Sequence, residues 1–246
     1  MLLCDQVSIH FPLRRARLRR KMLSGSAQTG GKIITHNGAP YVAALQGITT
    51  HFQKGDCVAL IGHNGSGKTT LLRTLAGIYQ PFSGRVTRRG RTATMFSSTL
   101  SLSDMETGRQ NIGVSAVLHG ISPERLAESM DEIVELCGLG DYIDVPVAIY
   151  SDGMRARLGL AMAIVGDPDI LLVDEAMTTT DSRFLASIRE NTRYFGNEET
   201  VTVIATHARD LTDALCNRAL WLEHGHLKAF GDYDDVMTQY QVSRDA

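Results

Sequence analysis

The sequence predicts an α/β fold with a mostly parallel sheet, a flanking antiparallel β subdomain and an inserted helical subdomain. Strand and helix patterns alternate near both ends of the chain, as in a parallel sheet covered by helices. Alternating and β-branched residues before position 62 favour antiparallel strands, and the middle of the chain reads as helical. We expect one domain, 1–246, with a helical subdomain at 98–165 and a core with its β subdomain at 1–97 and 166–246.

The composition is that of a globular protein. Of the 246 residues, 43% are hydrophobic and 21% charged, and the net charge of −2 gives no general attraction to nucleic acid. Four scattered cysteines without a C-x-x-C pair disfavour a disulfide framework or a zinc site. No run of 18 apolar residues occurs, so we expect no membrane-spanning helix. Because the net charge is near zero and no concentrated basic groove is evident beyond residues 14–21, we also expect no nucleic-acid partner.

The first elements precede a glycine-rich loop. A short strand is expected at 2–9, followed by the basic run RRARLRRK at 14–21. That run is either a solvated face or a contact for anionic headgroups or an acidic partner. A glycine- and serine-rich link at 24–31 leads to the strand pattern YVAALQGITTHF and then, after the turn QKGD, to the strand CVALIG.

The stretch ALIGHNGSGKTT reads as a buried strand, a glycine-rich loop and the start of a helix. It fits the phosphate-loop pattern G-x-x-x-x-G-K-[ST]. Glycines let a phosphate chain approach backbone N–H groups, and the helix directs its positive end at the same phosphates. Lys68 is expected at the β- and γ-phosphates and Thr69 on Mg²⁺. The predicted nucleotide-binding residues of this loop are Gly62, His63, Asn64, Gly65, Ser66, Gly67, Lys68, Thr69 and Thr70.

Helical signals dominate after the loop. A helix is expected from Thr69 to Ile78, ended by Pro81, Ser83 and Gly84, and the sequence GRVTRRGR is hairpin-like. A later helix starts at Ser122-Pro123 and ends at Gly138. Its packing face is predicted to consist of Leu126, Met130, Ile133 and Val134.

Three strand patterns follow, namely DILLVDE at 169–175, TVTVIATH at 200–207 and RALWLEHG at 218–225. The first ends in Asp174 and Glu175, where one carboxylate can hold Mg²⁺ and the next can orient or deprotonate water. The alternative is a pair of acids that merely caps a strand end. Upstream, Ser151 and Gly153 mark a helix N-terminus suited to an anion or, more simply, a helix cap.

Four motifs together resemble a known family. GHNGSGKT, YSDGM-x-x-RL, LLVDE and TH at 206–207, in this order, resemble the nucleotide-binding subunit of an ATP-binding cassette (ABC) transporter. TGRQNI and the ending HGHLKAFGDYDDV are similar to its polysaccharide-export branch, which serves capsule, O-antigen and teichoic acid. The resemblance covers nearly the whole chain and implies a RecA-like P-loop NTPase core that hydrolyses ATP with Mg²⁺.

The resemblance also implies residue roles. Two copies would pair head to tail, with ATP between the phosphate loop of one and Ser151 and Gly153 of the other. Glu175 would be the catalytic base, His207 would contact the γ-phosphate, and Asp181 would lie in a loop touching the other subunit. An aromatic ring would stack on adenine; Tyr41 is the nearest candidate by spacing, and Phe11 is the alternative.

The function implied is an ATPase that energises export through a separate membrane permease. It would bind peripherally at the cytoplasmic face of the bacterial inner membrane. Two other functions compete with this one. A soluble ATPase of DNA repair or translation usually carries coiled-coil insertions or two cassettes, and an importer of small solutes usually carries the signature LSGGQ instead of YSDGM.

Two departures from the family pattern affect the site. The segment TATMFSSTLSLSDMETG has no glutamine where the family senses Mg²⁺ and its membrane partner. Ser97 or Ser98 stands there, and Gln110 lies too far along. Asp152 adds a carboxylate close to where a partner's γ-phosphate should lie, so it must point away, be paired, or weaken the closed dimer.

Overall fold

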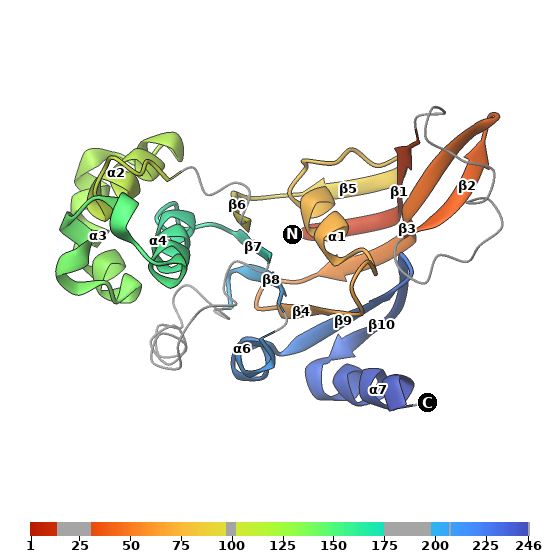
Figure 1. Cartoon of the computed structure of the whole chain (residues 1–246). Coiled ribbons are helices and arrows are strands. Elements are labelled where there is room, and N and C mark those ends of the chain that lie inside the picture. Colours follow the sequence, from red (N-terminus) through yellow and green to blue (C-terminus); the bar gives the residue numbers. More distant parts are fainter. Residues whose placement is uncertain (14–30, 97–101, 175–197, 207, 246) are drawn as a thin grey trace. The chain divides into compact units, whose positions relative to one another are not determined.

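A computed structural model describes residues 1–13, 31–96, 102–174, 198–206 and 208–245. The chain forms two compact units, which are coloured along the sequence in Figure 1. The first unit consists of Met1–Gln53, Val58–Arg89 and Asn217–Ala246. The second consists of Lys54–Cys57 and Gly90–Cys216. Among the described residues, no helix is both long and apolar enough to cross a membrane.

The first unit contains a four-stranded sheet in the order β2-β3-β1-β5. All its pairings are antiparallel. Side chains of β3 alternate between buried and more exposed over its second half, which is the pattern of a sheet with one covered face. The antiparallel β subdomain predicted near the phosphate loop is therefore confirmed. The strands are β1 (Leu2–Pro12), β2 (Lys32–His36), β3 (Ala39–Phe52) and β5 (Ser83–Arg88).

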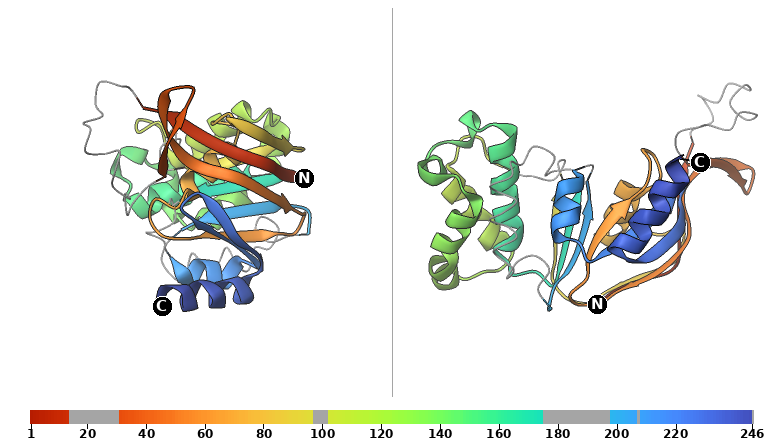
Figure 2. Two further views of the ribbon diagram at one scale, coloured as in Figure 1. Left: turned by 90° about the vertical axis from the view of Figure 1, so that its right-hand side faces the viewer. Right: turned by 90° about the horizontal axis from the view of Figure 1, so that it is seen from below.

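The same unit holds the strand that leads into the phosphate loop. Strand β4 (Cys57–Ile61) pairs in parallel with β9 (Arg218–Glu223), which pairs antiparallel with β10 (His226–Asp232). Helix α1 (Lys68–Leu75) follows β4, and α7 (Tyr233–Asp245) packs on β9 and β10 (Figure 2). The interior of β4 is buried, which explains its unbroken apolar run.

The second unit has a parallel sheet in the order β8-β7-β6. Its strands are β6 (Thr92–Phe96), β7 (Ile170–Asp174) and β8 (Val201–Ala205). Every residue of β7 and β8 is buried, so their sequences read as continuous apolar runs. The strands predicted at 169–175 and 200–207 are thus confirmed.

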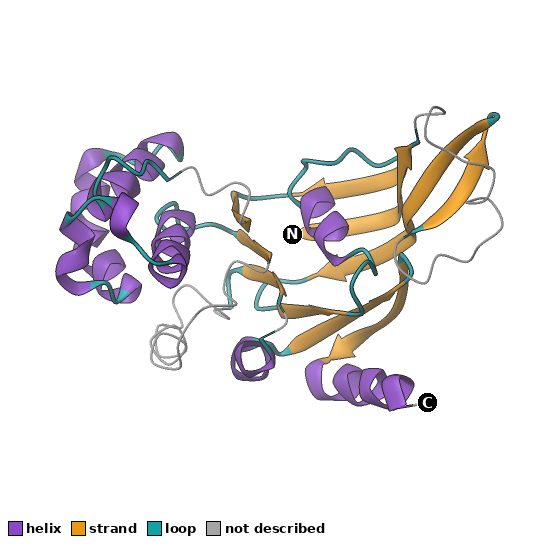
Figure 3. Ribbon diagram, viewed as in Figure 1, coloured by secondary structure: helices purple, strands orange, loops and turns teal. Residues whose placement is uncertain are grey.

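Helices make up the rest of the second unit (Figure 3). The helices predicted for the middle of the chain are confirmed, with two short 3-10 helices between them. Ser122 caps α3 by accepting from the Arg125 N–H at 3.3 Å, and Gly138 ends it in the left-handed conformation, as the sequence indicates. The helices are α2 (Gly108–Leu118), α3 (Pro123–Cys137), η3 (Gly140–Asp144), η4 (Val147–Ile149), α4 (Asp152–Ile164) and α6 (Arg209–Leu215).

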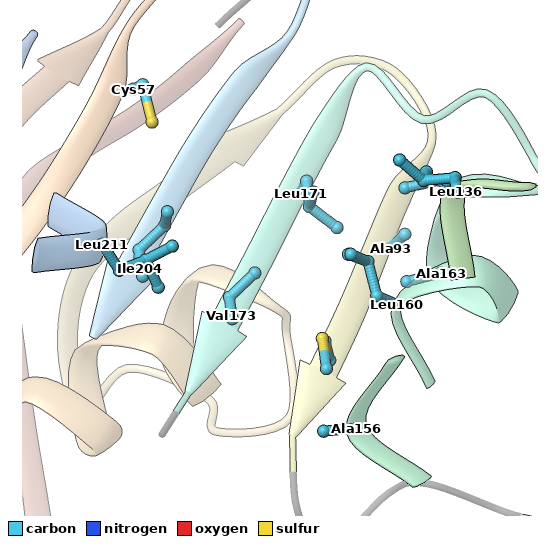
Figure 4. Close-up of a cluster of buried hydrophobic side chains, with 12 residues drawn as sticks. Cys57, Ala93, Leu136, Ala156, Leu160, Ala163, Leu171, Val173, Ile204 and Leu211 are labelled. Atoms are coloured by element: carbon cyan, nitrogen blue, oxygen red, sulfur yellow. The ribbon is translucent and has the colours of Figure 1, made fainter. Parts of the chain in front are cut away.

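Two apolar clusters hold this unit together. One joins the sheet to α4, where Leu160 and Ala163 face Ala93 of β6, next to Leu171 of β7 (Figure 4). The other lies among the helices and includes the fully buried Ile112, together with Ile133 and Leu158. The predicted packing face of α3 belongs to it. Helix α4 contributes residues to both clusters, so packing on two sides holds the helix in position.

One local prediction needs correction, and one hairpin was not predicted. The hairpin predicted over 84–91 is wrong, because β5 pairs with β1 whereas β6 pairs with β7 in the other unit. A hairpin that was not predicted from the sequence joins β9 to β10. Its turn is His224-Gly225, with φ of +47° and +80°. Asn-Gly is the common sequence signal for such a turn, and because this turn has His-Gly instead, the sequence did not indicate it.

Candidate functional site

The phosphate loop fills the gap between β4 and α1. Strand β4 ends at Ile61, and α1 begins at Lys68 with Gly67 as its N-cap. Three leucines of α1 are buried and anchor the helix: Leu71, Leu72 and Leu75. The loop is therefore held at both ends by buried elements, as the sequence predicts.

The glycines are required by the space around them. At Gly62, φ is +144°, and a Cβ would lie 2.2 Å from the Leu222 carbonyl oxygen. At Gly67, φ is +112°, and a Cβ would lie 2.9 Å from Leu45 Cδ2. Gly65 has φ of +81°. No side chain fits without strain, so backbone N–H groups line the loop.

Hydrogen bonds close the loop around a lysine. The Ser66 N–H donates to the His63 carbonyl at 3.1 Å, and the Leu71 N–H donates to the Gly67 carbonyl at 2.8 Å. The Lys68 ammonium donates to the carbonyls of Gly62 at 2.7 Å and His63 at 3.2 Å. Lys68 is only 8% exposed, so a positive charge is kept inside the loop.

The loop fits a triphosphate. The Ser66 hydroxyl is buried and has no protein hydrogen-bond partner, as expected of a group that meets a ligand. The glycine cradle, the enclosed ammonium of Lys68 and the N-terminus of α1 all favour an anion. The residues predicted from Gly62 to Thr70 thus lie together in one unit.

Asp174 stands at the end of β7 in the second unit and is 7% exposed. The carboxylate of Asp174 offers oxygen ligands of the kind that Mg²⁺ prefers. In the described part of the chain, no cluster of three or more His, Cys, Asp or Glu side chains is placed to hold a metal ion.

The predicted signature segment opens α4. The Ser151 hydroxyl accepts from the Met154 N–H at 3.3 Å, which confirms Ser151 as a helix cap. Asp152 is the first helical residue and is exposed, where the helix dipole stabilises a negative charge. A polar pocket of about 250 Å³ lies here, lined by Gly138, Leu139, Tyr142, Ser151, Gly153, Met154 and Arg157.

Hydrogen bonds to neighbouring segments hold this helix N-terminus. Arg155 donates to the Asp104 carboxylate at 2.6 Å and to the Val147 carbonyl at 3.0 Å. The Tyr150 hydroxyl donates to the Tyr142 carbonyl, and burial raises the pKa of that hydroxyl. The signature segment is therefore fixed by contacts on both sides of Ser151.

The segment TGRQNI has a structural role that sequence reasoning missed. Thr107 and Gln110 form a reciprocal capping box at the start of α2. Asn111 is 2% exposed and binds the backbone of Ser103 and Thr107 through its amide. The pattern T-x-x-Q was the available signal. The Gln110 side chain is engaged in this cap.

The two aromatic candidates differ in surroundings. Tyr41 in β3 lies in a ring cluster with His10, His36 and Phe82, with centroids at 6.0–6.4 Å. Phe11 in β1 meets Tyr79 edge-on at 5.1 Å. Both belong to the first unit, and the choice between them stays a prediction.

Several predictions fall outside the described residues. They are the catalytic roles of Glu175 and His207, the contact loop of Asp181, the substitution at Ser97 or Ser98, the basic run at 14–21, and the link at 24–31 except for Gly31. The phosphate loop belongs to the first unit, whereas Asp174, Ser151 and Gly153 belong to the second.

Comparison with known proteins decides the family. A model of the ABC transporter family matches residues 45–178. The O-antigen export system ATP-binding protein RfbE of Yersinia enterocolitica is 39% identical over 228 residues, which cover 91% of this chain and 95% of the relative. This chain belongs to the ABC transporter family.

Further matches agree with that assignment. The O-antigen export protein RfbB of Klebsiella pneumoniae is 34% identical, covering 83% of this ABC subunit and 82% of the relative. The dimeric ATP-binding cassette MJ0796, solved with ADP and phosphate, gives a TM-score of 0.74 at 18% identity and covers 94% of this chain and 98% of its own. The resemblance and the fold class predicted from the motifs are confirmed. ATP hydrolysis is the activity of such cassettes, and this chain is an ATPase.

Proposed function

We propose that this ABC subunit hydrolyses ATP to energise export of a polysaccharide or glycolipid across the cytoplasmic membrane through a separate permease. One observation carries the proposal: 39% identity to an O-antigen export subunit over nearly the full length of both chains. The complete phosphate loop, with its enclosed lysine, supports the ATPase half of it.

Each residue of the proposed ATP site has a role that follows from its chemistry. Lys68 and the loop N–H groups bind the β- and γ-phosphates, and Ser66 donates its unpaired hydroxyl to a phosphate oxygen. Thr69 and Asp174 would hold Mg²⁺, which supplies charge neutralisation at the phosphates. Glu175 is proposed to accept a proton from the attacking water, and His207 to contact the γ-phosphate.

A second copy is proposed to complete the site. Ser151 caps a helix whose positive N-terminal end favours an anion, and Gly153 adds no side chain in the way. In a head-to-tail dimer these groups would meet the γ-phosphate on the partner's phosphate loop, with Asp181 near the contact. Binding of ATP then closes the dimer and hydrolysis reopens it.

The permease is proposed to dock on α2. Val114, Val117 and Leu118 are 56%, 71% and 77% exposed on this helix, an unusual density of apolar surface. A groove of about 490 Å³ is lined by these three residues and by Glu106, Gln110 and Gly113. A short cytoplasmic helix of the permease fits such a groove. This would hold the subunit at the cytoplasmic face of the inner membrane.

Export is tested by deleting the gene in its host. We expect surface polysaccharide to disappear and lipid-linked glycan to accumulate inside the cell, and the wild-type gene to restore export. Lys68→Ala should fail to restore it, because the loop loses its enclosed charge. The matched control is Lys54→Ala, which removes an exposed lysine paired with Glu199 and should restore export. Normal surface polysaccharide in the deletion strain would contradict the proposal.

A further inference from the structure

The turn between β9 and β10 is tied to the phosphate loop. The Gly225 N–H donates to the Ser66 carbonyl at 2.9 Å, and the Gln46 N–H donates to the Gly225 carbonyl at 2.9 Å. The Gln46 side chain also donates to the His224 carbonyl at 3.3 Å. The turn is therefore held between strand β3 and the loop, and all three elements belong to the first unit.

The fit between turn and loop leaves little room. A Cβ on Gly225 would lie 2.6 Å from the Ala44 carbonyl oxygen. A Cβ on Gly67 would lie 3.0 Å from the same oxygen and 3.8 Å from Gly225 Cα. The turn cannot shift far without disturbing the glycine that caps α1.

Inside the loop, His63 orients a peptide group. Its Nδ1 lies 2.8 Å from the Asn64 carbonyl oxygen. A carbonyl only accepts, so the hydrogen is on Nδ1. In a planar trans peptide the N–H of Gly65 points opposite to the Asn64 carbonyl, and hence away from the His63 ring. The imidazole thus determines the direction of one of the N–H groups that cradle phosphate.

His224 in turn holds the His63 ring. The two ring centroids are 4.5 Å apart, at an interplanar angle of 51°. The Nε2 of His63 is buried and has no hydrogen-bond partner among the described residues. The contact that the structure shows for the ring, besides the hydrogen bond of Nδ1, is its packing against the His224 ring. Near the two histidines, the Lys228 ammonium lies 2.8 Å from the Glu223 carboxylate. The hydrogen bond from Lys228 lowers the pKa of the Glu223 carboxyl, and the charges of His224 and His63 lower it further.

We propose that His224 is a positioning residue of the nucleotide site. Through its ring it holds His63, and His63 holds the Asn64 carbonyl so that the Gly65 N–H faces the triphosphate. His224 itself never touches the nucleotide. The inference rests on the proposed ATP site, and it assigns the β9–β10 turn the task of keeping the phosphate loop in its binding conformation.

The test is a double-mutant cycle with His224→Asn and His63→Asn in the full chain. Asparagine tolerates the left-handed φ at position 224, so the turn is kept while the ring is lost. We expect His224→Asn to raise the dissociation constant for ATP and the KM about 3- to 10-fold, with kcat and the unfolding midpoint unchanged. The double variant should bind ATP no more weakly than His63→Asn alone, because one substitution acts through the other. His226→Asn, an exposed histidine two residues on, is the matched control and should bind as wild type.

Three results would overturn the inference: wild-type affinity in His224→Asn, fully additive losses in the double variant, or a loss of affinity that merely follows a lowered unfolding midpoint. Failure of the wild-type chain to bind ATP would instead overturn the proposed function, and this inference with it.

Discussion

Gly62 shows at the scale of one residue why the phosphate loop needs its glycines. We expect Gly62→Ala to weaken ATP binding at least about tenfold, because a Cβ at 2.2 Å from the Leu222 oxygen must displace the loop backbone. Titration with a fluorescent ATP analogue measures the change.

Gly38→Ala is the matched control for this prediction. Gly38 also has a positive φ, +72°, but nothing lies within 4 Å of a Cβ there. It should lose about 1 kcal/mol of stability from backbone strain and keep its affinity for ATP. Equal ATP affinities of the two variants would show that the close approach at Gly62 does not shape the loop.

Asp152 is the residue whose role the sequence left open. The structure places it, exposed, at the first position of α4, where the helix dipole stabilises it by about 0.3–1 kcal/mol. Asp152→Ser should therefore lower stability slightly. If the carboxylate faces the γ-phosphate in the proposed dimer, the substitution should also tighten ATP-driven dimerisation, because a like charge is removed. Light scattering with ATP measures the dimer.

The control for Asp152 removes the same charge elsewhere in the unit. Asp141→Ser, at an exposed position of η3, changes the net charge equally and should leave dimer affinity unchanged. If both variants dimerise as wild type does, the Asp152 carboxylate points away from the partner's nucleotide.

At the scale of elements, α2 carries the prediction about the permease. Val117→Asp should abolish co-purification with the permease, because a charge enters an apolar surface that is 71% exposed in the isolated chain. The ATPase rate of the purified subunit alone should not change. Val242→Asp makes the same substitution at a 65% exposed valine of α7 and should leave the complex intact. If the Val117→Asp variant still co-purifies with the permease, the permease docks on another surface.

Elements were predictable from the sequence where their signals are local. Helix α3 carries its own cap, packing face and terminating glycine, and the loop after β4 carries its own pattern, so both were predicted correctly. The hairpin at 84–91 failed because β5 pairs with β1, about 80 residues away, and no local pattern encodes that choice.

The candidate site divides in the same way. Lys68, Asp174 and Ser151 could be predicted from motifs, because the chemistry restricts residue type and spacing. The contact of His63 with His224, and the engagement of Gln110 in a cap, arise from pairings that the motif does not contain. Only folding brings the β9–β10 turn to the loop.

At the scale of the whole molecule, the chain offers half of each of two sites. We propose that its phosphate loop binds the triphosphate of one site and that its α4 N-terminus meets the γ-phosphate of the other. The central claim is that two copies enclose ATP and that hydrolysis separates them. ATP binding and dimerisation are then linked, so that ATP favours the dimer and hydrolysis favours the monomer.

The most direct test is the oligomeric state of Glu175→Gln with ATP. The amide cannot accept a proton from water, so ATP should stay bound and the variant should run as a stable dimer in size-exclusion chromatography with light scattering. Wild type with ADP and Glu175→Gln without nucleotide should both be monomeric. A Glu175→Gln variant that stays monomeric at saturating ATP, or that turns ATP over at the wild-type rate, would contradict the account.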